Sequence, residues 1–524
     1  MAQNEQRKAR LSGPLLSFVA IASISLLLFL VTWLIDFADS PLTLLDAVKG
    51  AIGTGALTGL PEVIVGVLGV SITVVAIIVE LASNRYTARI TELFMTSAVN
   101  IAILGFFVIT GMMCLWVSVV AGYQGTVPAA ATIVTLSFVG LCLLLLLPYF
   151  AFVFNFVNPH NIIDRMGVSV LGAVRRGGSG GAQERMKHSA TRGIEQLADV
   201  ASGAIESKDK VVCMHAVSAL GRLAADYLEE KPRLRPDWFS LDAMVRENPD
   251  FVSMQNDILK DIEDNRYWVE MKILRQFQML YGESLNRMRD INYLLAIHTR
   301  KTAEKALDTG DEAVVALCVK FFNTFLRATI NARDVRTAYN VLNQYRLLAE
   351  GALIRHKGLV AVDIARRFKY YGQLGFASGI AFVLETAAYD LCELNEMAFV
   401  QNAPCLPQLL DILLEVDKEA EEGHSMEASL RGVRKAQIKL ATFFLTRGAQ
   451  EPARTIFNDM KDELPSRLQS IHEELSGIRS RDFWEINDRG INFDYLDVDR
   501  RAALETFFSW FDADAKKQES ACSR

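Results

Sequence analysis

Residues 129–157 read AAATIVTLSFVGLCLLLLLPYFAFVFNFV, a run of 29 residues without a charged side chain. At about 1.5 Å of rise per helical residue, this run exceeds a hydrocarbon core of roughly 30 Å. It therefore predicts a transmembrane helix that is long enough to tilt, or to bend at Pro148. Apolar runs elsewhere predict three further spans, at residues 15–35, 63–82 and 98–120.

The first apolar run also has features of a secretory signal peptide, because Arg7, Lys8 and Arg10 precede it. Its 21 residues exceed the usual apolar core of a signal peptide, and no small-residue cleavage site follows it. We expect this span to be retained.

The composition divides the chain into two parts. With 51% hydrophobic residues and a mean hydropathy of +0.19, the chain is too apolar for an average soluble protein. Residues 1–157 hold only 13 of the 116 charged side chains, so the excess hydrophobicity is confined to this transmembrane domain. The net charge of −6 argues against a nucleic-acid partner, and the lipid bilayer is the partner that the composition implies.

Basic residues predict the orientation of the spans. Clusters at residues 7–10, 85–89 and 165–187 all fall on one face of the membrane, whereas the opposite connections carry mainly acids. By the positive-inside rule, both termini and the large C-terminal domain are cytoplasmic. The seven cysteines show no metal-ligand spacing, so we expect reduced thiols in that compartment.

The outer connection between the first two spans is rich in glycine. Gly50, Gly53, Gly55 and Gly59 alternate with small or apolar residues and lead into Glu62. A short helix followed by such a return is typical of a re-entrant pore loop, since irregular backbone at membrane depth needs protein or water to satisfy it. Alternatively, Gly55 and Gly59 form a small-xxx-small pair that lets two helices approach, or the segment is an ordinary extramembrane turn.

Three polar residues of the second predicted span are candidates for lining a path. They are Ser71, Thr73 and Glu80. An acid within a span is costly and often functional, but Glu80 also has Arg85 nearby and Glu62 lies at the interface, so plain solvation is the alternative for both.

Two segments carry a family resemblance. Residues 65–89, VGVLGVSITVVAIIVELASNRYTAR, run from an apolar span into a motif close to A-S-S-Q-F-S-P-R, which Ala82, Ser83 and Arg89 match and Asn84 does not. This stretch, and residues 193–223 after it, resemble a bacterial family of four-span integral membrane proteins that is catalogued only as a domain of unknown function. The resemblance covers roughly the first 230 residues, implies a bacterial inner-membrane location, and implies no activity.

The remainder of the chain is predicted to be entirely helical. Residues 158–183 form a juxtamembrane segment that ends in a glycine-rich hinge, RRGGSGGAQ, at 175–183. From 184 to 515 apolar residues recur at helical spacing, with breaks such as that at 308–311, and a polar tail follows at 516–524. No fixed period repeats, so we predict an all-α chain with a large, solenoid-like cytosolic domain and no named repeat.

The sequence shows no motif of a known catalytic or cofactor site. It lacks GxxxxGK[ST], strand-borne GxGxxG, HExxH, GxSxG and paired CxxC, and no two of its seven histidines lie within helical reach of one another. We therefore expect no enzyme activity, no cofactor and no metal. The acids between Asp488 and Asp499 are too irregular for an EF-hand loop, which favours a solvated turn.

A concentration of arginines is a candidate patch for an anionic ligand or lipid headgroups. Its members are Arg333, Arg336, Arg346, Arg366 and Arg367, with Arg327 just before them. Alternatively these arginines pair with their own acidic neighbours, of which Asp334 and Asp363 are nearest. Near the C-terminus, the aromatic residues between Phe507 and Phe511 are expected to dock the last helix on the domain, or to anchor a partner.

Two hypotheses follow for the function. In the first, the chain is a homo-oligomeric ion channel or conduit, and its helical domain forms a cytosolic gate. In the second, the spans only tether and assemble a helical scaffold or sensor that binds a cytosolic protein partner. The sequence indicates neither the permeant species nor the partner.

Overall fold

The computed structural model describes residues 21, 23–35, 60–85, 91, 94–124, 128–178, 183–417, 427–483, 485–486, 488–490 and 492–522. All regular structure in these ranges is helical, and no strand occurs among them, so the predicted all-α fold is confirmed. The chain divides into two compact units, Met1–Asp164 and Arg165–Arg524, which we describe separately.

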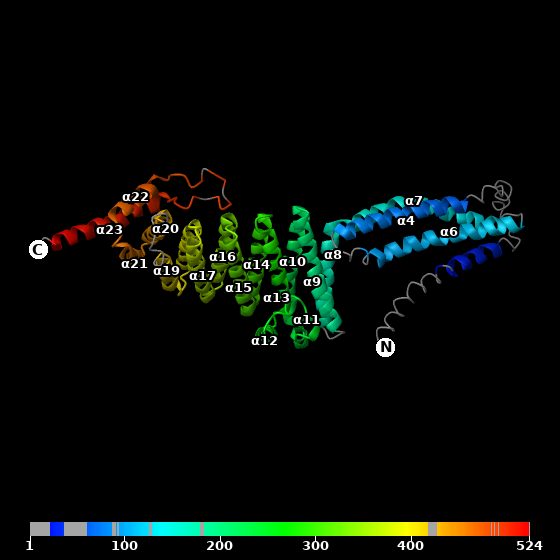
Figure 1. Ribbon diagram of the computed structural model, residues 1–524, viewed down its shortest axis with the longest axis horizontal. Helices are drawn as coiled ribbons and strands as arrows, with labels where there is room; N and C mark the ends of the chain where they lie inside the picture. The colour runs from blue at the N-terminus through cyan, green and yellow to red at the C-terminus, as the bar shows by residue number, and fades with distance from the viewer. Residues whose placement is uncertain are drawn as a thin grey trace. The chain divides into compact units, whose positions relative to one another are not determined.

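Long apolar helices build the N-terminal unit (Figure 1). They are α4 (Leu60–Arg85), α6 (Ala98–Gln124) and α7 (Ala129–Val157), and residues 23–35 form a further apolar helix. Each of the three long helices is long and apolar enough to cross a membrane. Ser23–Ile35 is the described helical stretch of the first predicted span, and most of the residues before it lie outside the described ranges.

The helices of the N-terminal unit pack into a bundle. The three long helices contact one another in all pairs. Phe29 of the first helix packs against Met113 and Val117 of α6 and against Ala131 of α7. Its ring lies 6.2 Å from that of Trp116, centroid to centroid.

The C-terminal unit is a stack of helical hairpins, drawn from green to red in Figure 1. The helix pairs α9/α10, α13/α14, α15/α16 and α17/α18 each pack as antiparallel neighbours. The elements of this unit, including the helix that enters it, are α8 (Pro159–Gly178), α9 (Gln183–Glu206), α10 (Lys210–Glu230), η1 (Lys231–Arg233), η2 (Pro236–Phe239), α11 (Ala243–Arg246), α12 (Asn256–Asp264), α13 (Trp268–Ser284), α14 (Arg289–Thr309), α15 (Glu312–Asn331), α16 (Val335–Ile354), α17 (Gly358–Ala377), α18 (Phe382–Val400), α19 (Leu406–Leu414), α20 (Glu427–Thr446), α21 (Gln450–Met460), α22 (Pro465–Gly477) and α23 (Val498–Cys522).

Two layers of helices run along this stack. The first layer holds α9, α13, α15, α17, α19 and α21, and the second holds α10, α14, α16, α18, α20 and α23; within each layer every helix contacts the next. Such a stack, in which each hairpin is covered by its neighbours, is a solenoid. α10 and α15 are apolar and long enough to resemble spans, but their apolar residues are mostly buried between the layers.

Short turns of one recurring geometry join the hairpin helices. Lys208, Gly310 and Arg333 have φ values of 58°, 76° and 54°, in the left-handed region, and each precedes an aspartate. The carboxylates of Asp209, Asp311 and Asp334 accept the backbone N–H three residues ahead at 3.2 Å, which caps α10, α15 and α16. The break predicted at residues 308–311 is one of these turns.

The glycines that end α8 are packing positions. Arg175–Gly178, the start of the predicted hinge, forms the last turn of α8, and residues 179–182 lie outside the described ranges. A Cβ atom on Gly177 would lie 2.3 Å from the Trp238 ring, and one on Gly178 would lie 2.3 Å from the Leu234 side chain. These two glycines are therefore required for close contact with the segment that follows α10.

Candidate functional site

The glycines of the predicted pore loop, Gly50, Gly53, Gly55 and Gly59, lie outside the described residues. Glu62 is described and stands exposed in the first turn of α4. The hypothesis of a re-entrant loop therefore stays a prediction.

The predicted path-lining residues of α4 do not share one face. Ser71 is buried and donates to the Val67 carbonyl oxygen at 2.7 Å, whereas Thr73 is exposed and donates to the Gly69 carbonyl oxygen at 2.7 Å. Glu80 is exposed as well. Ser71 borders a cavity of about 10 Å³ against α6 and α7, which has room for about one water molecule at most. Within one copy of the bundle, only Ser71 of these three faces inward.

Two polar pairs inside the bundle were not singled out from the sequence. The Tyr149 hydroxyl donates to Asn100 Oδ1 at 2.8 Å, and Asn100 Nδ2 donates to the Phe94 carbonyl oxygen at 3.2 Å. Cys142 Sγ lies 3.3 Å from Thr110 Oγ1. A polar Asn100 within an apolar run is the signal that could have identified the first pair.

The candidate arginine patch is largely paired with carboxylates of the chain itself. Arg336 binds Asp488, Arg346 binds Glu350 and Asp390, and Arg367 binds Asp363. Arg333 occupies a turn before α16, and Arg366 is exposed on α17.

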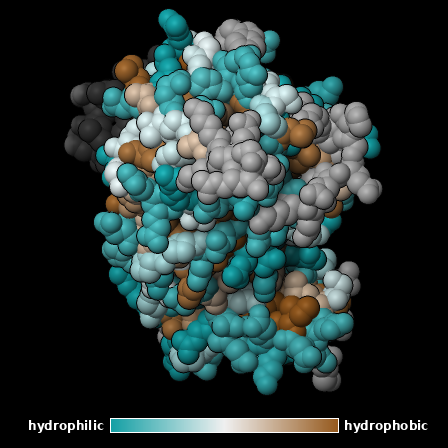
Figure 2. Space-filling model, turned by 90° about the vertical axis from the view of Figure 1, so that its left-hand side faces the viewer, coloured by the Kyte–Doolittle hydropathy of each residue, from teal (hydrophilic) through white to brown (hydrophobic). Residues whose placement is uncertain are grey.

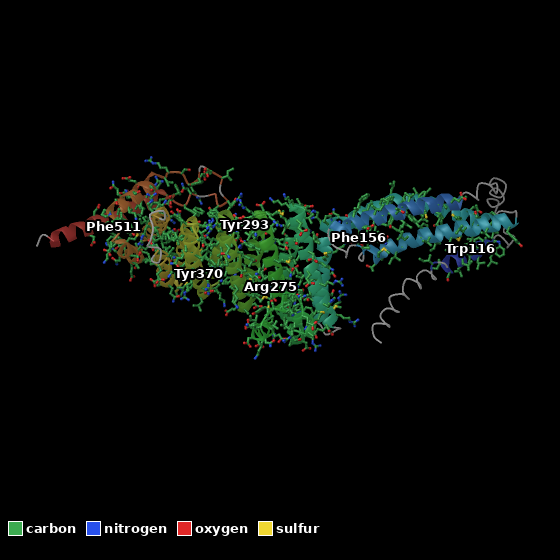
Figure 3. All side chains as sticks on the ribbon, in the orientation of Figure 1. Trp116, Phe156, Arg275, Tyr293, Tyr370 and Phe511 are labelled. Carbon is green, nitrogen blue, oxygen red and sulfur yellow. The ribbon has the colours of Figure 1, made fainter. Side chains whose placement is uncertain are left out.

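Arg327, just before the patch, donates to the Tyr370 hydroxyl at 2.6 Å; Figure 3 labels Tyr370 on α17. Asp334 binds Arg289 and caps α16, so it does not neutralise Arg333.

An irregular, looped segment, residues 478–497, of which all but 484, 487 and 491 are described, crosses the second layer of helices. We call it the strap. It leaves α22, runs back along the solenoid toward α16, and returns to α23, as the orange segment in Figure 1 shows. Asp488 anchors its far end, because its carboxylate accepts two hydrogen bonds of 3.0 Å from Arg336 and one of 2.8 Å from Asn340. This pairing lowers the pKa of Asp488.

Arg489 is the central anchor of the strap. Its guanidinium donates to both carboxylate oxygens of Asp390, a side chain with 1% exposure, and to the Tyr339 carbonyl oxygen at 2.7 Å. The same guanidinium lies over the Tyr339 ring, 4.1 Å from its centroid. Paired charges, a backbone acceptor and an aromatic face therefore converge on one strap residue.

The near end of the strap lies on α18 and α20. The Phe493 ring stacks on Tyr389 at 4.6 Å, and Lys439 Nζ donates to the Phe493 carbonyl oxygen at 3.1 Å. Asp494 accepts hydrogen bonds from Tyr389 and, at 2.6 Å, from Lys435. Asp488 and Asp494 lie in turns, as expected, but both are bound to basic side chains of the solenoid, which the expectation of a solvated turn did not include. Local sequence patterns do not predict these pairs, because the partners lie 59 to 152 residues away.

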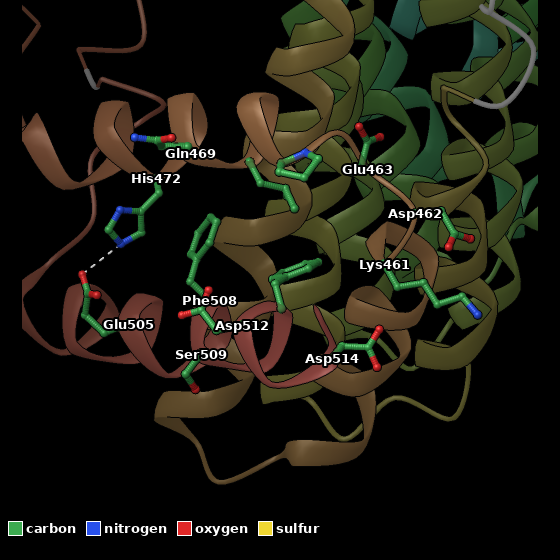
Figure 4. Close-up of a pocket in the computed structure, with 13 residues that line it drawn as sticks. Lys461, Asp462, Glu463, Gln469, His472, Glu505, Phe508, Ser509, Asp512 and Asp514 are labelled. Carbon is green, nitrogen blue, oxygen red and sulfur yellow. Dashed lines mark hydrogen bonds and ion pairs between the residues drawn. The ribbon is translucent and has the colours of Figure 1, made fainter. Parts of the chain in front are cut away.

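A surface pocket lies at the end of the C-terminal unit. An open pocket of about 870 Å³ forms between α22 and α23, lined by acids and by the rings of Phe508 and Phe511 (Figure 4). His472 Nε2 lies 3.0 Å from the Glu505 carboxylate across it. Figure 2 looks onto this end of the molecule, where hydrophilic residues dominate and hydrophobic groups are scattered between them.

The aromatic residues of α23 dock this helix on the unit, as the sequence predicts. Phe507 is fully buried, and the rings of Phe507, Trp510 and Phe511 surround Phe457 of α21. Figure 3 labels Phe511 at this end.

Within the described residues, no group of three or more His, Cys, Asp or Glu side chains is arranged to hold a metal ion. Cys213, Cys318, Cys392 and Cys405 of the C-terminal unit are buried and free. Burial raises the pKa of the Cys213 thiol to about 12, so this thiol is protonated at neutral pH and a weak nucleophile.

Comparison with known proteins concerns mainly the first part of the chain. Residues 14–226 match the model of a family described as "Predicted membrane protein (DUF2254)". The match confirms the resemblance. It extends from the first apolar helix through α8 and α9 and ends within α10, so it includes the first hairpin of the solenoid. The family description assigns no activity.

No curated protein matches the chain. Among solved structures, a "Circular tandem repeat protein with novel repeat topology and enhanced subunit contact surfaces" is similar over 78% of this chain and 85% of its own, with 12% identity and a TM-score of 0.35.

Proposed function

We propose that this protein is a membrane-anchored helical scaffold whose solenoid binds a looped segment of a cytosolic partner protein across α16, α18 and α20. One observation carries the proposal: the strap, itself a looped segment, already lies across these helices as a bound peptide would. A partner segment offering an arginine and, four residues later, an aromatic ring would find the contacts that Arg489 and Phe493 make.

The chemistry of these contacts supports a peptide ligand. The helices supply the buried carboxylate of Asp390 for a guanidinium, the Tyr389 ring for stacking, and Lys439 for a main-chain carbonyl oxygen. Solenoids present extended surfaces of this type because each hairpin adds side chains to the same face. A non-enzymatic role is consistent with this arrangement and is part of the proposal.

The location belongs to the same proposal. The apolar helices and the basic clusters beside them support a multi-pass protein of the bacterial inner membrane with both termini in the cytoplasm. A homo-oligomer in the membrane would present several solenoids together.

The described residues favour the conduit less than the scaffold. Ser71 and Thr73 satisfy their hydroxyl groups on their own helix, and the cavity beside Ser71 holds about one water molecule at most. A conduit would therefore need several copies around an axis. Ion flux through the reconstituted protein, compared with Gly55→Val, tests that alternative directly.

The scaffold is tested with the protein's own strap sequence as a probe. A fluorescent peptide of residues 478–497 is titrated into full-length protein in nanodiscs. Arg489→Ala in the protein weakens its own strap, so we expect the peptide to bind this variant at least about tenfold more tightly than it binds the unmodified protein. Adding Asp390→Asn to that variant should return peptide binding to the weak level of the unmodified protein.

Arg481→Ala is the matched control, because Arg481 lies on the same strap and is exposed, and its contact with the described residues is through its main chain, where its carbonyl oxygen accepts from the Asn492 N–H at 2.9 Å. It should leave peptide binding as weak as in the unmodified protein. Hydrogen exchange across residues 488–496 reports separately whether the strap has been released. A released strap without peptide binding would contradict the proposal.

A further inference from the structure

A cavity of about 700 Å³ lies between the N-terminal ends of α16 and α18 and the strap. This volume falls within the range of roughly 300–1,000 Å³ that small-molecule sites occupy. Both the solenoid and the strap contribute walls, since Tyr339 and Phe382 come from the helices, and Phe483, Ile486 and Phe493 come from the strap.

The walls of the cavity are mostly apolar and partly uncovered. Ile486 is completely exposed, and Phe382 has 42% exposure, although both border the same hollow. Exposed apolar side chains that converge on one cavity favour an apolar occupant, because covering them removes their contact with water.

Most polar groups of the cavity are already satisfied. Arg336 and Asp488 pair with each other, and Asp494 is held by Lys435 and Tyr389. These charged groups are therefore poorly placed to form an ion pair with a ligand.

Glu385 differs from these groups. Its carboxylate makes no hydrogen bond and no ion pair with any residue that the structure describes, although it borders the cavity. Burial raises its pKa, with Lys435 and Arg431 opposing that rise and Asp494 and Glu474 adding to it. A Cβ on Gly432 would lie 2.6 Å from Glu385 Cδ, so α20 packs closely on the back of this carboxyl group.

We propose that this cavity is a binding site for a small molecule that joins an apolar body to a cationic amine, with the Glu385 carboxylate as the counter-charge. The apolar body lies among Tyr339, Phe382 and Ile486, and the amine donates to Glu385. Glu385 is only partly buried, yet its carboxylate still loses hydration there, and a bound ammonium group offsets that loss by a charge-assisted hydrogen bond. This site lies beside the strap and shares Tyr339 and Phe493 with the strap contacts, but its counter-charge, Glu385, takes no part in them.

The test uses three probes of one size and different charge. They are 2-phenylethylamine, neutral 2-phenylethanol and anionic 3-phenylpropanoate, titrated calorimetrically at pH 7.5 into full-length protein in nanodiscs and into empty nanodiscs. We expect the amine to bind at least about tenfold more tightly than either other probe. Equal binding of the amine and the alcohol would overturn the proposal, as would the absence of any amine binding beyond that to empty nanodiscs.

Two variants locate the site. Glu385→Gln keeps the size of the side chain and should weaken amine binding at least about tenfold while leaving alcohol binding unchanged. Phe382→Ala should weaken both. Glu393→Gln, on the same helix and 3.9 Å from Lys439 through its carboxylate, is the matched control and should change nothing.

The same Glu385→Gln protein also separates this inference from the peptide proposal. Combined with Arg489→Ala, it should still bind the strap peptide, because Arg489 and Asp390 do not involve Glu385. Amine binding that survives Glu385→Gln would overturn the assignment of the counter-charge, whatever the peptide does.

Discussion

In the N-terminal unit large apolar side chains face outward, whereas in the C-terminal unit they face inward. Leu144 and Leu147 of α7 are 74% and 78% exposed. In the solenoid, Phe322 and Tyr345 are fully buried and stack on each other at 4.7 Å. The difference indicates two solvents, because an outward leucine is costly in water and favourable in lipid.

The polar groups of the two units differ in the same way. Hydroxyls of the N-terminal unit bond to carbonyls one turn back on their own helix, as in Ser71, Thr110 and Thr135. The solenoid instead buries charges and pairs them across distant segments, as in Arg489 with Asp390. The buried polar side chains described in the N-terminal unit are all uncharged, as an apolar solvent favours, whereas a water-exposed domain can hold buried ion pairs between its hairpins.

The largest loss of stability is expected from a substitution at a buried ion pair of the solenoid. Lys231 pairs with Glu270, which has no exposure, at 2.7 Å and with Asp311 at 2.6 Å. Burial raises the pKa of Glu270, and Lys231 opposes that rise. Lys231→Met leaves this carboxylate without its partner, so we expect the unfolding free energy of the C-terminal unit to fall by about 3–5 kcal/mol. Denaturant unfolding followed by circular dichroism measures it.

Lys357→Met is the matched control, because Lys357 forms an exposed pair with Glu312, which water and salt screen, so this change should affect stability far less than Lys231→Met does. Restoring neutrality with Lys231→Met and Glu270→Met together should recover most of the loss. Equal effects of Lys231→Met and Lys357→Met would contradict the view that a buried carboxylate without its partner destabilises this unit.

The contrast between the units also explains what the sequence could predict. Spans and hairpin breaks depend on residues close together in the chain, such as the run at 129–157 or the turn at Gly310 and Asp311, so pattern alone located them. The strap and the cavity beside it depend on pairs such as Arg489 with Asp390, which are 99 residues apart. Hydropathy periodicity contains no information on such pairs.

Acid should destabilise the solenoid through His298. This imidazole is buried against Gly221, where a Cβ would lie 2.0 Å from its Nδ1 atom. Burial lowers its pKa from 6.5 to about 4, with Lys301 and Arg222 adding to the effect. The unfolded chain therefore binds a proton first as pH falls. Its contribution to stability is complete above pH 6.5 and is lost between pH 6.5 and about 4, to a total of roughly 3 kcal/mol.

A pH series of denaturant unfolding, compared with His298→Gln, checks this sign. The carboxylates titrate in both proteins, so the difference between the two curves isolates the histidine. A flat difference between the His298→Gln and unmodified proteins would contradict a neutral buried His298.

A smaller effect is expected where α8 meets α9. A Cβ on Gly193 would lie 2.3 Å from Val170 Cγ2, and Val170 is itself buried. Gly193→Ala should destabilise the unit by about 1–3 kcal/mol, because a short buried valine cannot move aside. Gly282→Ala, in α13 with nothing within 4 Å of its new Cβ, should stabilise the unit by up to about 1 kcal/mol. Thermal unfolding of both variants compares a closely packed glycine with one that has open space around it. If both substitutions change the stability in the same direction, close packing does not decide the effect of Gly→Ala in this unit.

The smallest change in stability is expected when a tyrosine–asparagine hydrogen bond is removed, and each unit contains one such bond. Tyr149→Phe removes a bond of 2.8 Å to Asn100, and Tyr345→Phe removes one of 3.1 Å to Asn323. Asn100 is buried in an apolar bundle, whereas Asn323 is partly exposed and can bond to water. We expect Tyr149→Phe to lower the unfolding free energy by about 0.6–1.7 kcal/mol, and Tyr345→Phe to lower it by less. Detergent-induced unfolding for the first and denaturant unfolding for the second measure the losses. A larger loss at Tyr345 would mean that Asn100 finds another partner once Tyr149 is changed, and that lipid penalises this amide less than the structure implies.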